Sequence, residues 1–226
     1  MVKDPSLTPP SVDLEDPFDA ASEPEASLSE TLANQVDENE RAVYLIDDIN
    51  PEMLRRIIPT LHHLDYESDD PITLHVSTPG GISQCMFALA DCIGALVSPV
   101  NLIGYGEISS CGTVLLAVCA HRAIGSQCSV LLHGFSYDME GSFSAYELRA
   151  QADQMETKAR RWARLMAQRG GVALEPWLLS VALGEVDEVY LSAPTLVMMG
   201  WADTILDHPV RVPTGTAPDT SDTRPS

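Results

Sequence analysis

The chain has 226 residues, of which 45% are hydrophobic, with 33 acidic and 13 basic side chains and a formal net charge of −20. This length and hydrophobic content suffice for one good-sized core. An acidic excess of this size argues against binding to nucleic acid and against docking on anionic lipid, because both partners need a basic surface.

Targeting signals are absent from the sequence pattern. No run of eighteen or more apolar residues is present, so we expect no membrane-spanning helix. The first twenty residues, MVKDPSLTPPSVDLEDPFDA, lack the apolar segment of a secretory signal. The cysteines are odd in number and show neither a CxxC pair nor zinc-ligand spacing: Cys85, Cys92, Cys111, Cys119 and Cys128. We therefore expect a cytoplasmic protein with reduced core thiols, no metal site and no cofactor.

Both ends of the chain differ in composition from its centre. Residues 1–38 are rich in Pro, Ser, Asp and Glu, and residues 1–40 hold eleven acids against one lysine, so half of the net charge lies there. The segment 209–226 has a similar polar composition. We predict a disordered acidic arm over 1–38, one folded domain over 39–208 and a disordered tail over 209–226.

The folded part begins as alternating strands and helices. Strands are predicted over 41–46, 72–77 and 100–105 from short apolar runs that end at turn residues. A helix should begin after Asn50 and Pro51, a cap followed by proline at the first helical position, and Pro59 should kink or divide it. A second, buried helix is predicted over 82–97. This order predicts an α/β fold with a mainly parallel sheet.

The segment 104–133 carries the chemistry. It reads as a strand end, a turn of small residues, a buried helix, a short strand and a second strand that ends on His133. A long charged helix over 144–169 follows and ends at a Gly-Gly pair. A helix over 174–183, a helix capped by Ser192 and a last strand over 204–206 complete the chain.

A serine and a histidine in this segment are candidate catalytic residues. Ser110 stands where the turn becomes the helix, close to free backbone N–H groups, and His133 is able to act as its general base. From residue chemistry alone Ser109 is an equal candidate, Ser110 is also an ordinary helix cap, and His133 is also a buried structural histidine. The segment is not a G-x-S-x-G elbow, since Ile108 stands two residues before the serine.

The turn Pro79-Gly80-Gly81 is a second candidate element. Its glycines allow backbone N–H groups to face a cleft, and the N–H groups of Gly81 and Cys111 would together form an oxyanion hole. Read by itself, the motif is more often an ordinary tight turn.

Several spaced motifs resemble ClpP, the proteolytic subunit of the Clp proteases. VSTPGG resembles the family's strand followed by S-P-G-G, and GEISSCG resembles G-x-A-A-S-M-G. SVLLHG resembles the strand that ends on the catalytic histidine. The charged helix resembles the handle helix through which two rings meet, and YLSAPTLVMMGWADTIL resembles the family's F-L-S-A segment. The resemblance extends from residue 40 to about residue 206.

The resemblance implies a spiral of β-α units, shared with the crotonases, with a protruding handle helix. It assigns the nucleophile to Ser110 and the base to His133, and it places the catalytic acid at Glu188, where the family has Asp, with the adjacent Asp187 as the alternative. It implies a serine endopeptidase that cleaves extended polypeptides inside a homo-oligomeric ring, with rings able to stack. The acidic arm replaces the family's axial-loop segment, which argues against docking to an AAA+ unfoldase.

Three other functions remain as hypotheses. A phage capsid-maturation protease fits the missing axial loop. A catalytically decayed scaffold subunit would explain the glutamate at Glu188, and an acyl-CoA enzyme would share the spiral fold without a serine nucleophile.

Overall fold

The computed structural model describes residues 36–37, 40–136 and 139–206. The acidic arm and the tail predicted at the two ends of the chain lie outside these ranges, except for Val36–Asp37. These two residues form a short strand, β1, paired antiparallel with β2 (Ala42–Ile46). These two residues of the predicted arm therefore belong to the sheet, because pairing with β2 gives the backbone of β1 hydrogen-bonding partners.

The centre of the domain is a sheet in the order β1-β2-β3-β4-β5-β8. Strands β3 (Ile72–Thr78), β4 (Val100–Ile108), β5 (Arg122–Gly125) and β8 (Thr204–Leu206) run parallel to β2. Strand β6 (Ser129–Leu132) pairs with the end of β4 and, antiparallel, with β7 (Val189–Ser192). The predicted α/β fold with a mainly parallel sheet is confirmed.

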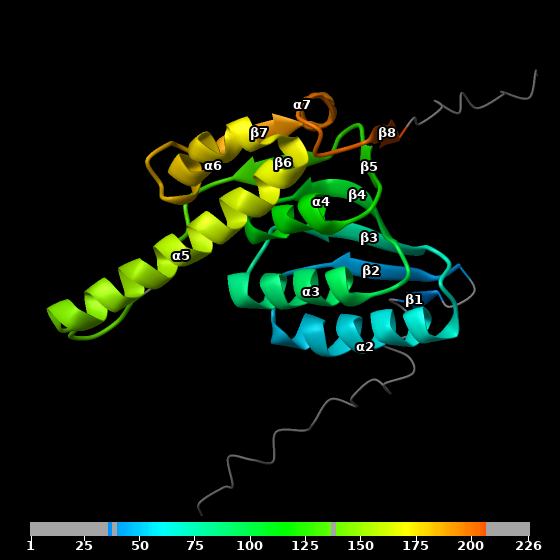
Figure 1. Ribbon diagram of the computed structural model, residues 1–226, viewed down its shortest axis with the longest axis horizontal. Coiled ribbons are helices and arrows are strands. Elements are labelled where there is room, and N and C mark those ends of the chain that lie inside the picture. The colour runs from blue at the N-terminus through cyan, green and yellow to red at the C-terminus, as the bar shows by residue number, and fades with distance from the viewer. Residues whose placement is uncertain (1–35, 38–39, 137–138, 207–226) are drawn as a thin grey trace, which may run out of the picture. The chain divides into compact units, whose positions relative to one another are not determined.

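The connections between parallel strands are helical, as crossover geometry requires. Helix α2 (Pro51–Glu67) joins β2 to β3, and α3 (Ser83–Ala95) joins β3 to β4. The 3-10 helix η1 (Ser110–Thr113) and helix α4 (Val114–Val118) join β4 to β5. Figure 1 shows α2 and α3 side by side along the strands.

Helix α2 corrects one expectation. Asn50 caps it by accepting a hydrogen bond from the Met53 N–H at 2.9 Å, as predicted. Pro59 lies inside the helix but does not divide it. Pro59 itself is exposed, whereas Ile57 and Leu61 on the opposite side are buried in the core. We infer that the packing of this apolar face outweighs the backbone hydrogen bond that proline cannot make.

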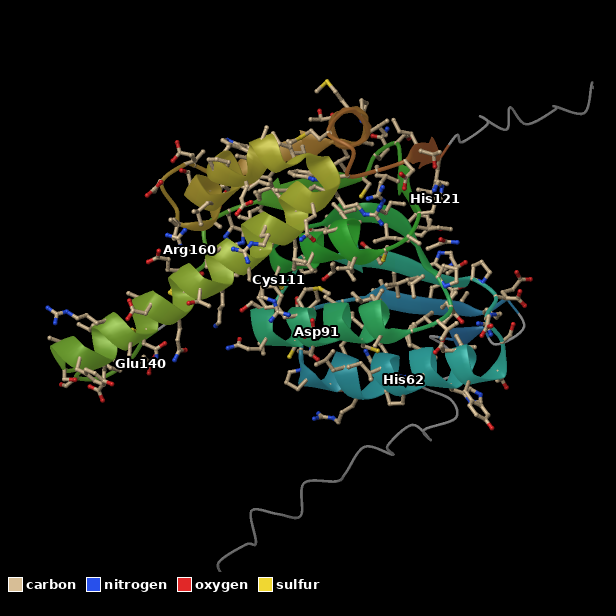
Figure 2. All side chains as sticks on the ribbon, in the orientation of Figure 1. His62, Asp91, Cys111, His121, Glu140 and Arg160 are labelled. Atoms are coloured by element: carbon tan, nitrogen blue, oxygen red, sulfur yellow. The ribbon has the colours of Figure 1, made fainter. Side chains whose placement is uncertain are left out.

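Helix α5 (Ala145–Gly170) is the long charged helix predicted from the sequence. Ser144 and Glu147 form a reciprocal capping box at its start, and Gly171, with φ 107°, follows its last residue. Trp162 and Met166 in its second half are buried, while Tyr146 and Leu148 in its first half are exposed. Figure 1 shows that first half extending beyond the other elements, and in Figure 2 Glu140 marks this outer end, far from Cys111.

The last elements pack against the second half of α5. A short 3-10 helix, η2 (Val172–Leu174), leads into α6 (Glu175–Ala182), and α7 (Ala193–Met198) follows β7.

The five cysteines are all buried and free. Among the described residues, no helix combines the length and apolar character needed to cross a membrane. Within the same ranges no cluster of His, Cys, Asp and Glu is able to hold a metal ion.

Candidate active site

Strand register brings the candidate residues to one edge of the sheet. Thr78 at the end of β3 pairs with Ile108 at the end of β4, and Glu107 of β4 pairs with Ser129 of β6. The carboxyl ends of parallel strands are where open α/β sheets form their binding crevices. Ser110 and His133 leave β4 and β6 at this edge.

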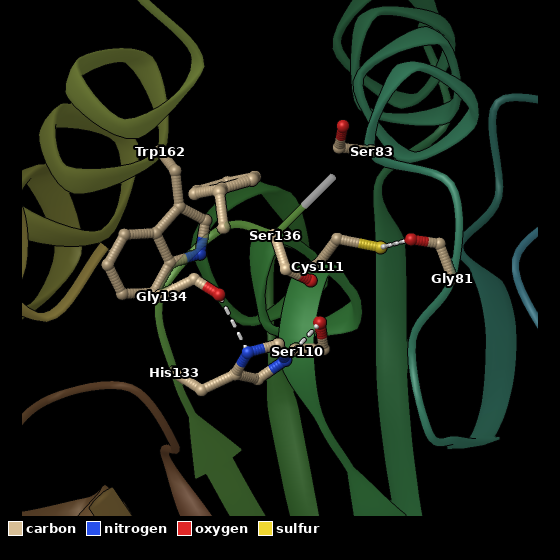
Figure 3. Close-up of a pocket in the computed structure, with 9 residues that line it drawn as sticks. Gly81, Ser83, Ser110, Cys111, His133, Gly134, Ser136 and Trp162 are labelled. Carbon is tan, nitrogen blue, oxygen red and sulfur yellow. Dashed lines mark hydrogen bonds between the residues drawn. The ribbon is translucent and has the colours of Figure 1, made fainter. Parts of the chain in front are cut away.

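The side chains of Ser110 and His133 are in contact. Ser110 Oγ lies 2.7 Å from His133 Nε2, and Figure 3 shows the two groups facing each other in one pocket. The other ring nitrogen, Nδ1, lies 2.8 Å from the Gly134 carbonyl oxygen. Because a carbonyl only accepts hydrogen bonds, Nδ1 is the donor in this contact, and in the neutral imidazole the Nε2 lone pair then faces the serine hydroxyl. This is the tautomer that a general base for Ser110 requires.

The geometry separates Ser110 from Ser109. Ser109 is 4% exposed and its hydroxyl donates to a Glu107 carboxylate oxygen at 3.0 Å, away from His133. Ser110 is half-buried and lines the pocket, and the N-cap position of η1 is occupied by Ser109 and not by Ser110. Its φ of 56° is one of two positive values at non-glycine residues in the described part of the chain. Such backbone strain often occurs at active sites.

The Pro79-Gly80-Gly81 turn lies beside Ser110. Gly80 has a φ of 104°, and a Cβ there would lie 2.6 Å from Ser110 Cβ and 2.8 Å from the Ser109 carbonyl oxygen. The sequence motif singled out Gly81, whereas the glycine that packs directly against Ser110 is Gly80. No property of the motif distinguishes the two glycines, since both favour the same unusual backbone.

Gly81 and Cys111 both line the pocket, as expected for oxyanion donors. The Gly81 carbonyl accepts a hydrogen bond from Cys111 Sγ at 3.4 Å (Figure 3). Apart from bonds internal to helices, neither of their N–H groups donates a hydrogen bond to a described residue. Burial raises the pKa of the Cys111 thiol to about 11, so this neighbour of Ser110 stays protonated and is not a competing nucleophile.

The two candidate acids are not in contact with His133. Asp187 and Glu188 are exposed, and Glu188 accepts a hydrogen bond from the Tyr190 hydroxyl at 3.0 Å. Leu132 pairs with Val189, so the next residues along the two antiparallel strands are His133 and Glu188. The register therefore brings the backbone of Glu188 opposite that of His133, while its side chain turns away.

Trp162, which lines the pocket, and its buried partner Thr113 were not identified as site residues from the sequence. The Trp162 indole of α5 forms part of the pocket wall (Figure 3). Its Nε1 donates to Thr113 Oγ1 at 2.9 Å. In the sequence, Trp162 is one residue of the long charged helix predicted over 144–169. A threonine in a buried turn and a tryptophan 49 residues away give no local signal of their contact.

The relatives of this chain are proteolytic subunits of Clp proteases. Subunit 2 of Treponema denticola is 29% identical over 136 residues, which are 59% of this chain and 67% of that protein. Subunit 4 of Rhodococcus jostii is 30% identical over 58% of this chain and 69% of its own length. Subunit 2 of Pseudomonas aeruginosa is 26% identical over 74% and 81% of the two chains.

The fold has a solved counterpart and the family is matched over most of the chain. A mutant of ClpP1 from Listeria monocytogenes superposes with a TM-score of 0.66 at 20% identity, covering 76% of this chain and 94% of that one. The Clp protease family profile matches residues 27–209. With the spiral α/β fold and this match together, the chain belongs to the Clp protease family.

Proposed function

We propose that this chain is an active serine endopeptidase in which Ser110 is the nucleophile and His133 the general base. The observation that carries the proposal is the 2.7 Å contact between Ser110 Oγ and His133 Nε2 in a shared pocket. A serine hydroxyl is a weak nucleophile unless a positioned base removes its proton, and this contact supplies the base.

The reaction proceeds through an acyl-enzyme. Ser110 Oγ attacks the carbonyl carbon of the scissile peptide bond while its proton passes to His133 Nε2. The N–H groups of Gly81 and Cys111 donate to the negative oxygen of the tetrahedral intermediate. The C–N bond then breaks as the proton moves from Nε2 to the leaving amine. A water molecule, activated by the same histidine, hydrolyses the ester at Ser110.

Glu188 is our candidate for the third member of the site. Its backbone lies opposite that of His133 by strand register, and a change of side-chain rotamer that breaks the bond to Tyr190 would direct its carboxylate toward the ring. In the present side-chain arrangement, the Gly134 carbonyl oxygen accepts the hydrogen bond from His133 Nδ1. Asp187, one residue earlier and exposed, is the alternative acid.

The proposed substrates are extended or unfolded polypeptides. An extended segment would lie along the exposed backbone edge near Gly81 and pair with it as an added strand, which gives binding with little sequence preference. We further propose that copies of the chain assemble into cytoplasmic rings that enclose the site. The exposed apolar residues at the start of α5, Phe143, Tyr146 and Leu148, support such self-association.

A fluorophosphonate probe tests the assignment directly. We expect the probe to label Ser110, with the adduct located by peptide mass mapping, and expect Ser110→Ala and His133→Ala to lose both labelling and peptide cleavage. Ser109→Ala is the matched control, because the Ser109 hydroxyl bonds Glu107 and not the histidine. A Ser110→Ala protein that cleaves peptides at the normal rate would refute the proposal.

A decayed scaffold subunit is the second candidate function. The distance of both acids from the imidazole favours it, because family proteases depend on an acid at this position, and Glu188 bonds Tyr190 instead. Under this hypothesis the purified chain assembles but reacts with no probe. Particle mass and probe labelling measured on the same sample distinguish the two functions.

A further inference from the structure

A chain of two hydrogen bonds connects helix α5 to the peptide bond that follows Ser110. The Trp162 Nε1–H donates to Thr113 Oγ1 at 2.9 Å, and the Thr113 hydroxyl donates to the Ser110 carbonyl oxygen at 2.7 Å. A threonine hydroxyl has a single hydrogen, so accepting from the indole and donating to the carbonyl uses it in one fixed direction. Trp162 is 3% exposed and Thr113 is fully buried, so the bond between them is shielded from water, and the Thr113 hydroxyl reaches the carbonyl from the protein interior.

The anchored carbonyl belongs to the peptide group that also carries the Cys111 N–H. A peptide group is planar, and in its trans form the C=O and N–H bonds point in opposite directions. The described part of the chain contains no cis peptide bond. Fixing the direction of the Ser110 carbonyl therefore fixes the direction of the Cys111 N–H as well.

The backbone at this position needs such support. Ser110 has a φ of 56°, an unfavourable value for a residue with a side chain. A bond to its carbonyl from a buried hydroxyl opposes relaxation of the turn to an ordinary conformation. Any rotation of this peptide group would move the N–H away from the site of the developing oxyanion, where preorganised donors act most strongly.

We propose that Thr113 is a positioning residue for the oxyanion hole, and that Trp162 acts through it. The inference rests on the proposed function of Ser110 and Cys111 and adds the device that aims the Cys111 amide. Because Trp162 belongs to the buried half of α5, the same two bonds make the long helix part of the support of the active site.

The test compares Thr113→Val with Thr113→Ser. Valine keeps the shape of threonine but has no hydroxyl, whereas serine keeps both hydrogen bonds. We expect Thr113→Val to lower kcat for a peptide substrate about tenfold to a hundredfold, with KM changed less than about twofold, because an oxyanion donor acts in the transition state. Thr113→Ser should stay within about threefold of the unmodified protein.

A peptide boronate provides a readout that a purely structural role would not change. Its tetrahedral adduct with the serine uses the oxyanion hole, while an uncleaved peptide ligand does not. We expect Thr113→Val to weaken boronate binding by a factor similar to the loss in kcat. Its affinity for an uncleaved peptide should remain unchanged.

The Trp162→Phe variant tests whether the indole acts through the hydroxyl. The Trp162→Phe/Thr113→Val double variant should have the kcat of Thr113→Val alone, because the indole then has no hydroxyl to orient. The thermal midpoints should differ between these two proteins, since Thr113→Val alone leaves a buried indole N–H unpaired. If the two variants have the same kcat but different thermal midpoints, the loss in kcat results from the missing hydroxyl and not from reduced stability. If Thr113→Val does not fold, the double variant is compared with Thr113→Ser in its place.

Two results would overturn the inference in distinguishable ways. A hydroxyl-free protein, Thr113→Val or the double variant, that cleaves peptides and binds the boronate as well as Thr113→Ser would refute the positioning role alone. An unmodified protein that neither cleaves peptides nor reacts at Ser110 would refute the proposed function, and the positioning role with it.

Discussion

At the scale of single residues, the site depends on close backbone packing around Ser110 as much as on its hydroxyl. Gly80 leaves no space for a side chain next to the nucleophile. Gly81, which was singled out from the motif, is a poor test of the oxyanion hole, because a Cβ there would lie 2.4 Å from the Ile49 carbonyl oxygen. A variant at Gly81 would therefore disturb the turn before it disturbed the chemistry.

Gly80→Ala should inactivate the proposed enzyme. The added methyl group must displace Ser110, and a shift of about 1 Å in a reacting group costs roughly a hundredfold in rate. We expect at least that loss in kcat/KM and in the rate of probe labelling. Gly94→Ala is the control: it lies in α3 with no atom within 4 Å of the new Cβ, and should keep full activity. Full activity in Gly80→Ala would show that the close approach is dispensable.

The roles of Glu188 and Asp187 are separable by neutral isosteres. We expect Glu188→Gln to lower kcat/KM roughly tenfold, less than the loss typical of a triad aspartate, because the Gly134 carbonyl already holds the Nδ1 proton. Asp187→Asn should change it less than about twofold. Tyr190→Phe frees the Glu188 carboxylate and should leave the rate equal or higher. A larger loss in Asp187→Asn than in Glu188→Gln would reverse the assignment.

At the scale of elements, a partly buried ion pair joins β5 to the turn before β8. Arg122 is 3% exposed, and its Nε and Nη2 donate to Asp203 at 2.8 and 2.6 Å, while the Asp203 carboxylate also accepts from the Arg122 backbone N–H. These bonds from Arg122 hold the pKa of Asp203 below its ordinary value, with a smaller contribution from His121. The parallel strand β8 is thus held to β5 by this ion pair as well as by backbone hydrogen bonds between the two strands.

Removing the Asp203 carboxylate should lower the stability of the protein at neutral pH but have little effect at acid pH. The folded-state pKa of Asp203 lies below the unfolded value, so its stabilisation is present above about pH 4 and is lost as the pH falls toward the folded-state pKa. At pH 7 we expect Asp203→Asn to lower the free energy of unfolding by roughly 1–2 kcal/mol, because the Asp203 side chain is 34% exposed and solvent screens part of its interaction with Arg122.

Urea unfolding of both proteins between pH 3 and 7 provides the measurement. Below about pH 4 the free energy of unfolding should fall less steeply with decreasing pH in the variant than in the unmodified protein. Asp91→Asn is the control, because Asp91 pairs with Arg161 on the surface with 72% of its side chain exposed. That change should cost less than about 1 kcal/mol. Equal acid sensitivity in the Asp203 variant and the unmodified protein would contradict the linkage.

At the scale of the whole molecule, the first half of the charged helix α5 projects from the domain and carries exposed apolar side chains. Tyr146 is 81% exposed and Leu148 is 49% exposed, on a helix stabilised at its start by the Ser144 capping box. Single exposed apolar residues are ordinary, but a projecting helix that carries several of them favours contact with another copy of the chain.

Particle mass tests the proposed assembly. We expect the unmodified protein to form a large particle at micromolar concentration. The Tyr146→Gln/Leu148→Gln variant should give a smaller particle, because glutamine is helix-compatible but contributes little apolar contact. Arg160→Gln, at an exposed position further along α5, should leave the mass unchanged. An unmodified chain that remains monomeric would refute the ring assembly.

The sequence by itself determined the local structure and the family. Apolar periodicity and turn residues predicted the parallel strands β3 and β4, the helix capped at Asn50 and the long helix that ends at Gly170-Gly171. These features depend on residues close in sequence, whose spacing reports the repeat of a helix or strand. The motifs that resemble the Clp proteases are likewise short and contiguous.

Only the tertiary structure decided which side chains meet. Residue chemistry left Ser109 and Ser110 equal, and strand register together with the positive φ of Ser110 brought one of them to His133. The same holds for the Gly134 carbonyl at the imidazole and for Trp162 on Thr113, across 49 residues. Such contacts depend on backbone direction and register, which the type of a residue does not encode. Pro59 does not divide α2 for a related reason: burial of the opposite helix face outweighed a local propensity.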